Sequence, residues 1–125
     1  MSYTRPLVSF IKKGIDAKTT GATKMGTTEN GTERFHPIFA VINVSAANTI
    51  AVVPTLSVGT NGASYNNILV AAAMTGLSSL HTLLKSDIVG ATGNVAPNTE
   101  IYVNISVGAT ATAMSLDVHL FGYYT

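Results

Sequence analysis

Alternating apolar and polar residues are clearest near the C-terminus of the chain. Between Glu100 and Val107 every second side chain is aliphatic, and the side chains between them are polar or aromatic. The alternation stops at Gly108, and it restarts to run from Met114 to Leu120. A period of two is typical of a strand with one buried face. We therefore predict two strands joined by a short link of small residues, in an antiparallel hairpin.

Two further strands are predicted in the middle of the chain. Residues 35–45 alternate but carry apolar side chains on both faces, which favours a central strand or one whose outer face meets a partner. Residues 46–48 are the predicted turn, and residues 50–58 are the next strand. Pro54 interrupts that strand, and since proline cannot donate to a ladder, it indicates an edge or a bulge.

Two segments fit more than one type of secondary structure. Residues 65–73 fit either a short strand at 68–70 or the start of a small helix, and we favour strand and loop because strands surround them. Residues 77–89 space their leucines as a short helix would, but serine and threonine are poor helix fillers. A strand near 82–84 is the alternative there. Residues 90–98 are a predicted loop.

The first 33 residues have a different composition. They hold one apolar cluster, around Phe10, which could be a short edge strand or an anchor that lies on another subunit. Threonine and glycine then dominate as far as Glu33. Such a stretch cannot bury enough apolar surface to offset its own ordering entropy. We expect residues 1–33 to be an extended N-terminal arm or long loop and residues 34–125 to be the body. Frequent strand signals without a long helix predict an all-β fold, an antiparallel β-sandwich.

Charge is scarce and unevenly placed. Only 10% of the residues are charged and the net charge is +1, so little repulsion keeps copies apart. This composition favours a protein that works against neighbours in an assembly. Five of the seven basic residues lie in the predicted arm, which would be either solvated or able to reach an acidic surface. An arm without interleaved aromatic residues beyond Phe10 argues against nucleic acid as the partner.

No group of residues in the sequence indicates a particular chemical reaction. Cysteine is absent, which excludes disulfides and thiolate metal sites. His36, His81 and His119 lack metal-ligand spacing, although a metal shared between chains on a trimer axis stays an alternative. Ser115 and Asp117 share a strand face with His119, but side chains that run side by side lack triad geometry. We expect no enzyme activity, no cofactor and no metal.

The sequence also shows no membrane-spanning run and no signal-peptide pattern, so we expect no membrane partner and synthesis in a cytoplasm. Tyr102, Tyr123 and Tyr124 could form a platform for stacking sugars. Aromatic residues at strand ends more often pack in a core or in a subunit interface.

Two stretches resemble small virion proteins of tailed bacteriophages. One is Pro54-Thr-Leu-Ser-Val-Gly-Thr-Asn-Gly-Ala-Ser-Tyr-Asn-Asn-Ile68, and the other runs from Asn98 to Tyr124. In those proteins a strand ending in Ser-Val-Gly-Thr precedes a Tyr-Asn segment, and a Pro-Asn-Thr-Glu turn enters strands that end in Gly-Tyr. The resemblance covers roughly residues 35–124. It implies a jelly-roll-like sandwich, most similar to capsid cement or decoration proteins, which are typically trimers located where capsomers meet.

We therefore expect a structural virion protein on the capsid surface, made in the host bacterial cytoplasm, that forms a homotrimer and bridges capsomers of the major capsid protein. The alternative is a tail or fibre module that binds a host surface glycan. The residues predicted to contact the capsid are Arg5, Phe10, Lys12, Lys13, Lys18 and Lys24. The candidates for the subunit interface are Phe39, Val41, Tyr102, Phe121 and Tyr123.

Overall fold

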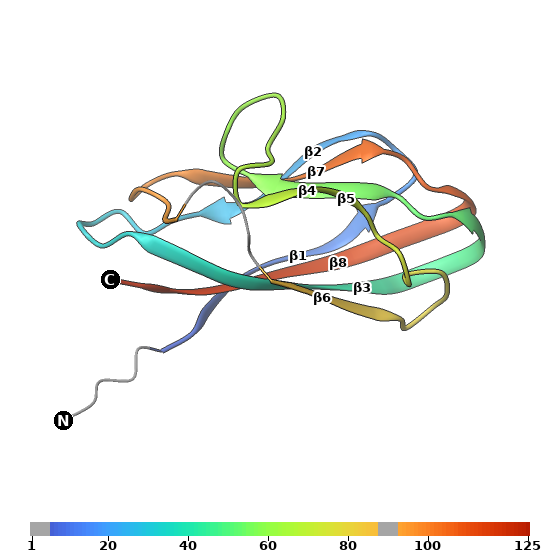
Figure 1. Cartoon of the computed structure of the whole chain (residues 1–125), viewed down its shortest axis with the longest axis horizontal. Coiled ribbons are helices and arrows are strands. Elements are labelled where there is room, and N and C mark those ends of the chain that lie inside the picture. Colours follow the sequence, from blue (N-terminus) through green and yellow to red (C-terminus); the bar gives the residue numbers. More distant parts are fainter. Residues whose placement is uncertain (1–5, 88–92) are drawn as a thin grey trace.

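The structure is a computed structural model that describes residues 6–87 and 93–125. Within these ranges it contains eight β-strands and no helix, and therefore no helix that could cross a membrane. The strands form two four-stranded antiparallel sheets that pack face to face (Figure 1). The prediction of an all-β antiparallel sandwich is confirmed.

The strands follow one another with short connections. Their bounds are β1 (Val8–Asp16), β2 (Gly21–Thr27), β3 (Phe35–Val52), β4 (Thr55–Gly59), β5 (Leu69–Ala73), β6 (Leu83–Asp87), β7 (Glu100–Val107) and β8 (Thr110–Tyr124).

The strands pair in a nested order, with β1 on β8, β2 on β7, β3 on β6 and β4 on β5. The first sheet has the order β1-β8-β3-β6, and the second sheet has the order β2-β7-β4-β5. This nesting of eight antiparallel strands in two sheets is the arrangement of a jelly roll.

Both sheets turn an aliphatic face toward the interior. Burial of each such side chain contributes about 1.5–3 kcal/mol relative to leaving it in water. The rings of Phe10 and Phe35 meet edge-on near one end of this core, with centroids 5.0 Å apart. The largest fully buried side chains are Phe35, Ile42, Leu56, Ile68, Leu77, Ile101, Ile105, Leu116, Leu120, Val44, Val58 and Val103.

The two C-terminal strands do not form the predicted hairpin. Both strands occur where the alternation placed them, but β7 pairs with β2 and β4, and β8 pairs with β1 and β3. The link between them carries the chain from the second sheet to the first. A Cβ atom on Gly108 would lie 2.2 Å from the carbonyl oxygen of Lys18, so this crossing has no room for a side chain. The alternation of apolar and polar residues shows only that one face of a strand is buried. This holds whether β7 and β8 pair with each other or lie in different sheets.

The prediction of an N-terminal arm is wrong for the residues from Val8 to Thr27. They form β1 and β2, which are edge strands of the first and second sheets. Ladder hydrogen bonds to β8 and β7 pair the inner side of each strand, and Val8, Phe10, Ile15 and Met25 pack on the core. The sandwich therefore includes residues on both sides of the expected boundary at residue 33. Arg5 lies outside the described residues.

The central strand β3 is longer than predicted. It lies between β8 and β6, which confirms the prediction of a central position. The turn predicted at 46–48 is wrong, because the strand continues to Val52 with a register shift between Val44 and Ala46. Pro54 lies between β3 and β4, where the chain crosses between the sheets and a ladder donor is not needed.

Strands also replace the two possible helices. Residues 69–73 form β5 and residues 83–87 form β6, so strand context overrides the helical spacing of the leucines. The loop predicted at 90–98 lies partly outside the described residues. Its described end includes Val95, which forms an isolated bridge with Phe35.

Candidate partner-binding surfaces

The described residues contain no group of three or more His, Cys, Asp and Glu side chains that could hold a metal ion. The carboxylate of Asp117 accepts a hydrogen bond from the backbone N–H of Gly14, at 2.9 Å. This bond ties Asp117 to β1 and leaves the candidate set of Ser115, Asp117 and His119 without the head-to-tail arrangement of a triad.

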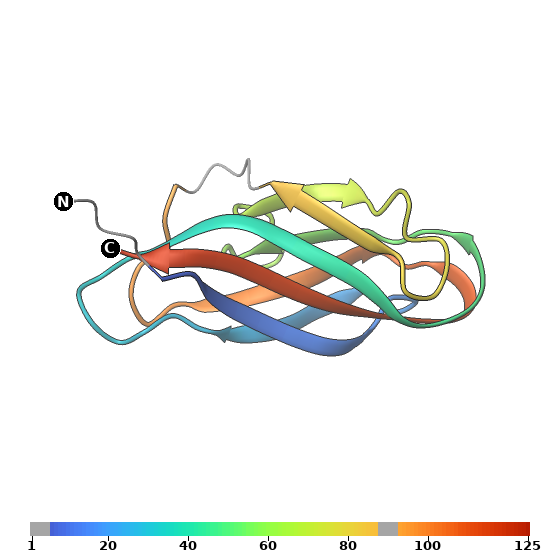
Figure 2. The same ribbon diagram turned by 90° about the horizontal axis from the view of Figure 1, so that it is seen from below.

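The outer face of the first sheet carries a row of five half-buried rings, His36, Phe39, His119, Phe121 and Tyr123, which we call the aromatic face. Strand register brings them together, because Phe39 lies opposite Phe121 and His36 lies opposite Tyr123. The four strands that carry this face and its margins lie side by side in Figure 2.

Ring stacking groups the side chains of the aromatic face into one pair and one set of three. The His36 and Tyr123 rings are nearly parallel, with centroids 4.9 Å apart, and Phe39 stacks on Phe121 at the same distance. The His119 ring is also parallel to that of Phe121, at 6.3 Å. Stacked pairs of this kind contribute about 0.5–1.5 kcal/mol beyond the area that they bury.

Apolar side chains and a few charges surround these rings. Ile11 of β1 and Leu83 of β6 lie on the same face as their cross-strand partners, and they are 44% and 70% exposed. The ammonium of Lys85 lies 5.1 Å from the centroid of the Phe39 ring and 3.4 Å from the carboxylate of Asp87. The aromatic face thus has an apolar centre with charges of both signs at its margin.

Part of the outer face of the second sheet, at Tyr102 and Asn104, is in contact with the protein's own loop. This loop, residues 60–68, connects β4 to β5 and projects at the top of Figure 1. Its Tyr65 ring lies 4.6 Å from that of Tyr102, and the side-chain amide of Asn104 donates to the carbonyl oxygen of Ser64. Tyr102 therefore already has an aromatic partner within the chain.

Hydrogen bonds fix the covering loop. The side-chain oxygen of Asn61 accepts the backbone N–H groups of Asn66 and Asn67, at 2.8 and 3.2 Å. A Cβ atom on Gly59 would lie 2.5 Å from the carbonyl carbon of Tyr65. The stretch from Pro54 to Ile68, which resembles phage virion proteins, thus contains the residues that hold this loop on the sheet.

An ion pair lies beside the covered ring. The Tyr102 hydroxyl donates to the carboxylate of Glu100 at 2.6 Å, and the ammonium of Lys24 lies 3.4 Å from that carboxylate. The hydrogen bond from Tyr102 and, after it, the bond and charge of Lys24 lower the pKa of Glu100. The same hydrogen bond raises the pKa of Tyr102.

Four of the predicted capsid-contact residues lie along one long side of the sandwich. Lys12 and Lys13 belong to β1, Lys18 to the following turn and Lys24 to β2, and we call these four the lysine strip. The strands that carry it lie together in blue on one side of Figure 2. Phe10 does not join the strip, since its half-buried ring packs on Phe35 inside the sandwich.

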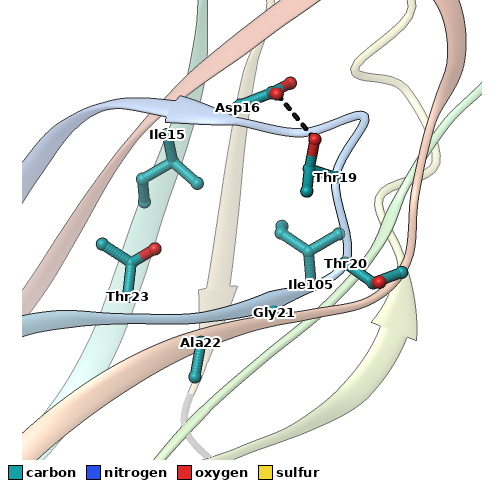
Figure 3. A pocket seen from close by; sticks show the side chains of 8 residues that line it. All are labelled: Ile15, Asp16, Thr19, Thr20, Gly21, Ala22, Thr23 and Ile105. Carbon is teal, nitrogen blue, oxygen red and sulfur yellow. Dashed lines mark hydrogen bonds between the residues drawn. The ribbon is translucent and has the colours of Figure 1, made fainter.

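A small pocket of about 320 Å³ lies beside the turn from β1 to β2 (Figure 3). Its one carboxylate, Asp16, accepts hydrogen bonds from the backbone N–H of Lys18 and the hydroxyl of Thr19. These two bonds lower the pKa of Asp16. The carboxylate therefore stabilises its own turn, and the threonines and Ile105 that line the pocket supply no second reactive group.

The structure divides the predicted interface residues between two surfaces. Phe39, Val41, Phe121 and Tyr123 lie on the first sheet, whereas Tyr102 lies beneath the loop on the second. The Tyr124 ring is near that of Phe35, and its hydroxyl accepts the backbone N–H of Glu29. Partial burial raises the pKa of Tyr124.

The three tyrosines consequently do not form the single sugar-stacking platform that the sequence suggested. His36 and His119 were not predicted as members of the aromatic face. The alternation along β8 places His119 with Phe121, but only the register between β3 and β8 brings His36 to Tyr123.

No protein-family model matches this sequence, and no curated protein matches it significantly. Solved phage structures do match. A chain in the capsid asymmetric unit of cyanophage Pam1 has a TM-score of 0.59 at 16% identity, covering 98% of this chain and 88% of that chain. A chain in the capsid of Ralstonia phage GP4 has a TM-score of 0.60 at 16% identity, covering 98% and 84%.

A third match is a chain in the acid-stable capsid of Helicobacter pylori bacteriophage KHP30, with a TM-score of 0.59 at 14% identity. It covers 96% of this chain and 93% of that chain. At these identities the three matches show a shared fold. The shared fold includes nearly the whole of this chain, β1 and β2 among it.

Proposed function

We propose that this protein is a structural component of a tailed-phage virion, and specifically a cement or decoration protein that stabilises the head by bridging neighbouring capsomers. The observation that carries the proposal is the fold shared, over 96–98% of this chain, with chains of three phage capsid structures. Because 84–93% of each matched chain is covered, those chains are little longer than this one.

The surfaces of the protein support this role. The lysine strip supplies positive charge on one long side of a sandwich whose net charge is only +1, which fits an acidic patch on the major capsid protein. Contacts of modest strength become effective when a symmetric oligomer repeats them, because the later contacts form within one bound complex. A homotrimer on the outer capsid surface would use the strip in this way.

Binding to capsids tests the proposal directly. Purified protein is mixed with expanded capsids that lack it, and the bound fraction is measured by sedimentation at increasing salt. We expect the protein to sediment with the capsids and to be released as salt screens the lysine strip. Protein that stays in the supernatant while binding to intact host cells would contradict the capsid role and favour a tail location.

A charge variant locates the contact. The double variant Lys12→Gln and Lys13→Gln should weaken capsid binding by about tenfold or more, since it removes two of the four strip charges from every copy. Arg34→Gln is the matched control, because it removes an exposed basic residue that belongs neither to the lysine strip nor to the aromatic face. Equal binding by both variants would rule out the strip as the capsid contact.

A further inference from the structure

The aromatic face is an apolar surface that the described residues leave open. Its rings are half-buried by one another, and their outer sides form a strip along β3 and β8 flanked by Ile11, Val41 and Leu83. Aromatic side chains are the residues most enriched at the centres of protein interfaces, and apolar patches on soluble proteins usually mark a contact. The loop at residues 60–68 lies on the second sheet, so it does not cover the aromatic face of the first.

The charges around the aromatic face indicate which kind of partner fits it. The margin carries one positive charge, Lys85, and two negative charges, Asp87 and Asp117, so its excess of a single negative charge is too small to attract a strongly basic partner. A second copy brings the same apolar centre and the same mixture of charges. The low net charge of the whole protein also leaves little repulsion between two copies.

The position of the lysine strip supports the same assignment. The strip follows the edge strands β1 and β2, whereas the aromatic face is centred on β3 and β8 in the middle of the first sheet. The two surfaces therefore point in different directions, and one molecule can use both at once. The apolar and nearly neutral aromatic face suits a contact between two copies of the chain. The lysine strip suits a contact with an acidic capsid surface.

We propose that copies of this chain associate through the aromatic face, with Phe39 and Phe121 at the centre of the contact. In the contact between two copies, the aromatic face of one would pack on the same face of the other, as in an isologous interface. The inference rests on the oligomerisation that forms part of the proposed function, but it does not require that the partner be a capsid.

The mass in solution tests the proposal. The wild-type protein is compared by analytical ultracentrifugation with the double variant Phe39→Ser and Phe121→Ser and with the control Tyr102→Ser. We expect an oligomer for the wild type and for Tyr102→Ser, and a dissociation constant raised by a hundredfold or more for the double variant. A monomeric wild type, or a double variant that keeps the wild-type mass, would overturn the proposal.

A second measurement does not depend on the fold of the double variant. Because the natural chain has no cysteine, a single cysteine reports on one position only. His119→Cys places a thiol on the aromatic face, and Ala22→Cys places one on exposed β2 in the second sheet. We expect alkylation at position 119, but not at position 22, to slow as protein concentration rises. Equal rates at all concentrations would overturn the proposal.

Capsid sedimentation of the same samples separates the two proposals. Wild-type protein that is monomeric and still binds capsids overturns the aromatic contact and leaves the capsid role standing. Wild-type protein that is oligomeric through the aromatic face but ignores capsids supports this contact and contradicts the capsid role.

Discussion

The outer faces of the two sheets both carry paired rings but differ in where the partner ring comes from. On the second sheet, Tyr102 lies against Tyr65 from the loop at residues 60–68, at 4.6 Å and with the rings tilted by 35°. On the first sheet, Phe39 and Phe121 stack on each other at 4.9 Å, and both come from strands of the sheet itself. The first arrangement uses the protein's own loop to cover part of a face, and the second is formed within the sheet.

The difference suggests that the two outer faces have separate roles, one in the stability of the single chain and the other in the proposed association of copies. Glycine at position 59 and the amide of Asn61 allow the covering loop to lie close to β7, so that face contributes to the stability of the single chain. Under the proposed association, the aromatic face provides the contact between copies. Variants on the two faces should therefore change different measured quantities.

The largest expected effect concerns the concentration dependence of stability. Because association stabilises only the folded state, the midpoint temperature of the wild type should rise by several degrees over a hundredfold increase in concentration. The Phe39→Ser and Phe121→Ser double variant should lose this rise, whereas Tyr102→Ser should keep it. Differential scanning calorimetry at two concentrations measures both. A midpoint that is independent of concentration in the wild type would mean that the open face is not a contact.

The next effect concerns the glycine under the loop. In Gly59→Ala, the new methyl group would meet the backbone of Tyr65 and Asn66, and the loop must move away from the sheet. We expect a loss of about 2 kcal/mol in the free energy of unfolding, measured in urea. Gly62→Ala is the matched control from the same loop, because a methyl group there meets open space. Similar losses in the two variants would show that the loop is not held as closely as the structure indicates.

A smaller effect should appear in the coupling between rings. A double-mutant cycle on Tyr65 and Tyr102, each changed to alanine, should give a coupling of about 1 kcal/mol in the free energy of unfolding. The same cycle on Phe39 and Phe121 should give a similar coupling in dilute protein and a larger one when the protein is concentrated. If both cycles respond equally to concentration, the contrast between a closed and an open face fails.

The smallest effect is on the pH dependence of the covered face. The pKa of Glu100 is lowered in the folded protein, so its contribution to stability is present above its unfolded pKa and is lost as pH falls through the folded one. For a carboxylate this loss falls between about pH 5 and pH 2. Glu100→Gln should flatten the profile of urea midpoint against pH slightly, and an unchanged profile would show that water screens the contact completely.

The sequence by itself determined the type of most elements in the body. Alternation placed the strands at 100–107 and at 114–120 because each has one face toward the core, and Pro54 indicated where the ladder is interrupted. The resemblance to phage virion proteins indicated the jelly-roll arrangement. The stretch that carries this resemblance contains the loop residues from Gly59 to Asn67, although the sequence alone does not show what they contact.

The tertiary structure decided which strands pair and which faces remain open. Alternation is the same whether a strand pairs with its neighbour in sequence or with a distant one, so the hairpin of β7 and β8 was predicted wrongly. The edge strand β2 has one large apolar residue, Met25, and its pairing with β7 makes it a strand. The aromatic face depends on the register of β3 with β8, a long-range property that no local pattern contains.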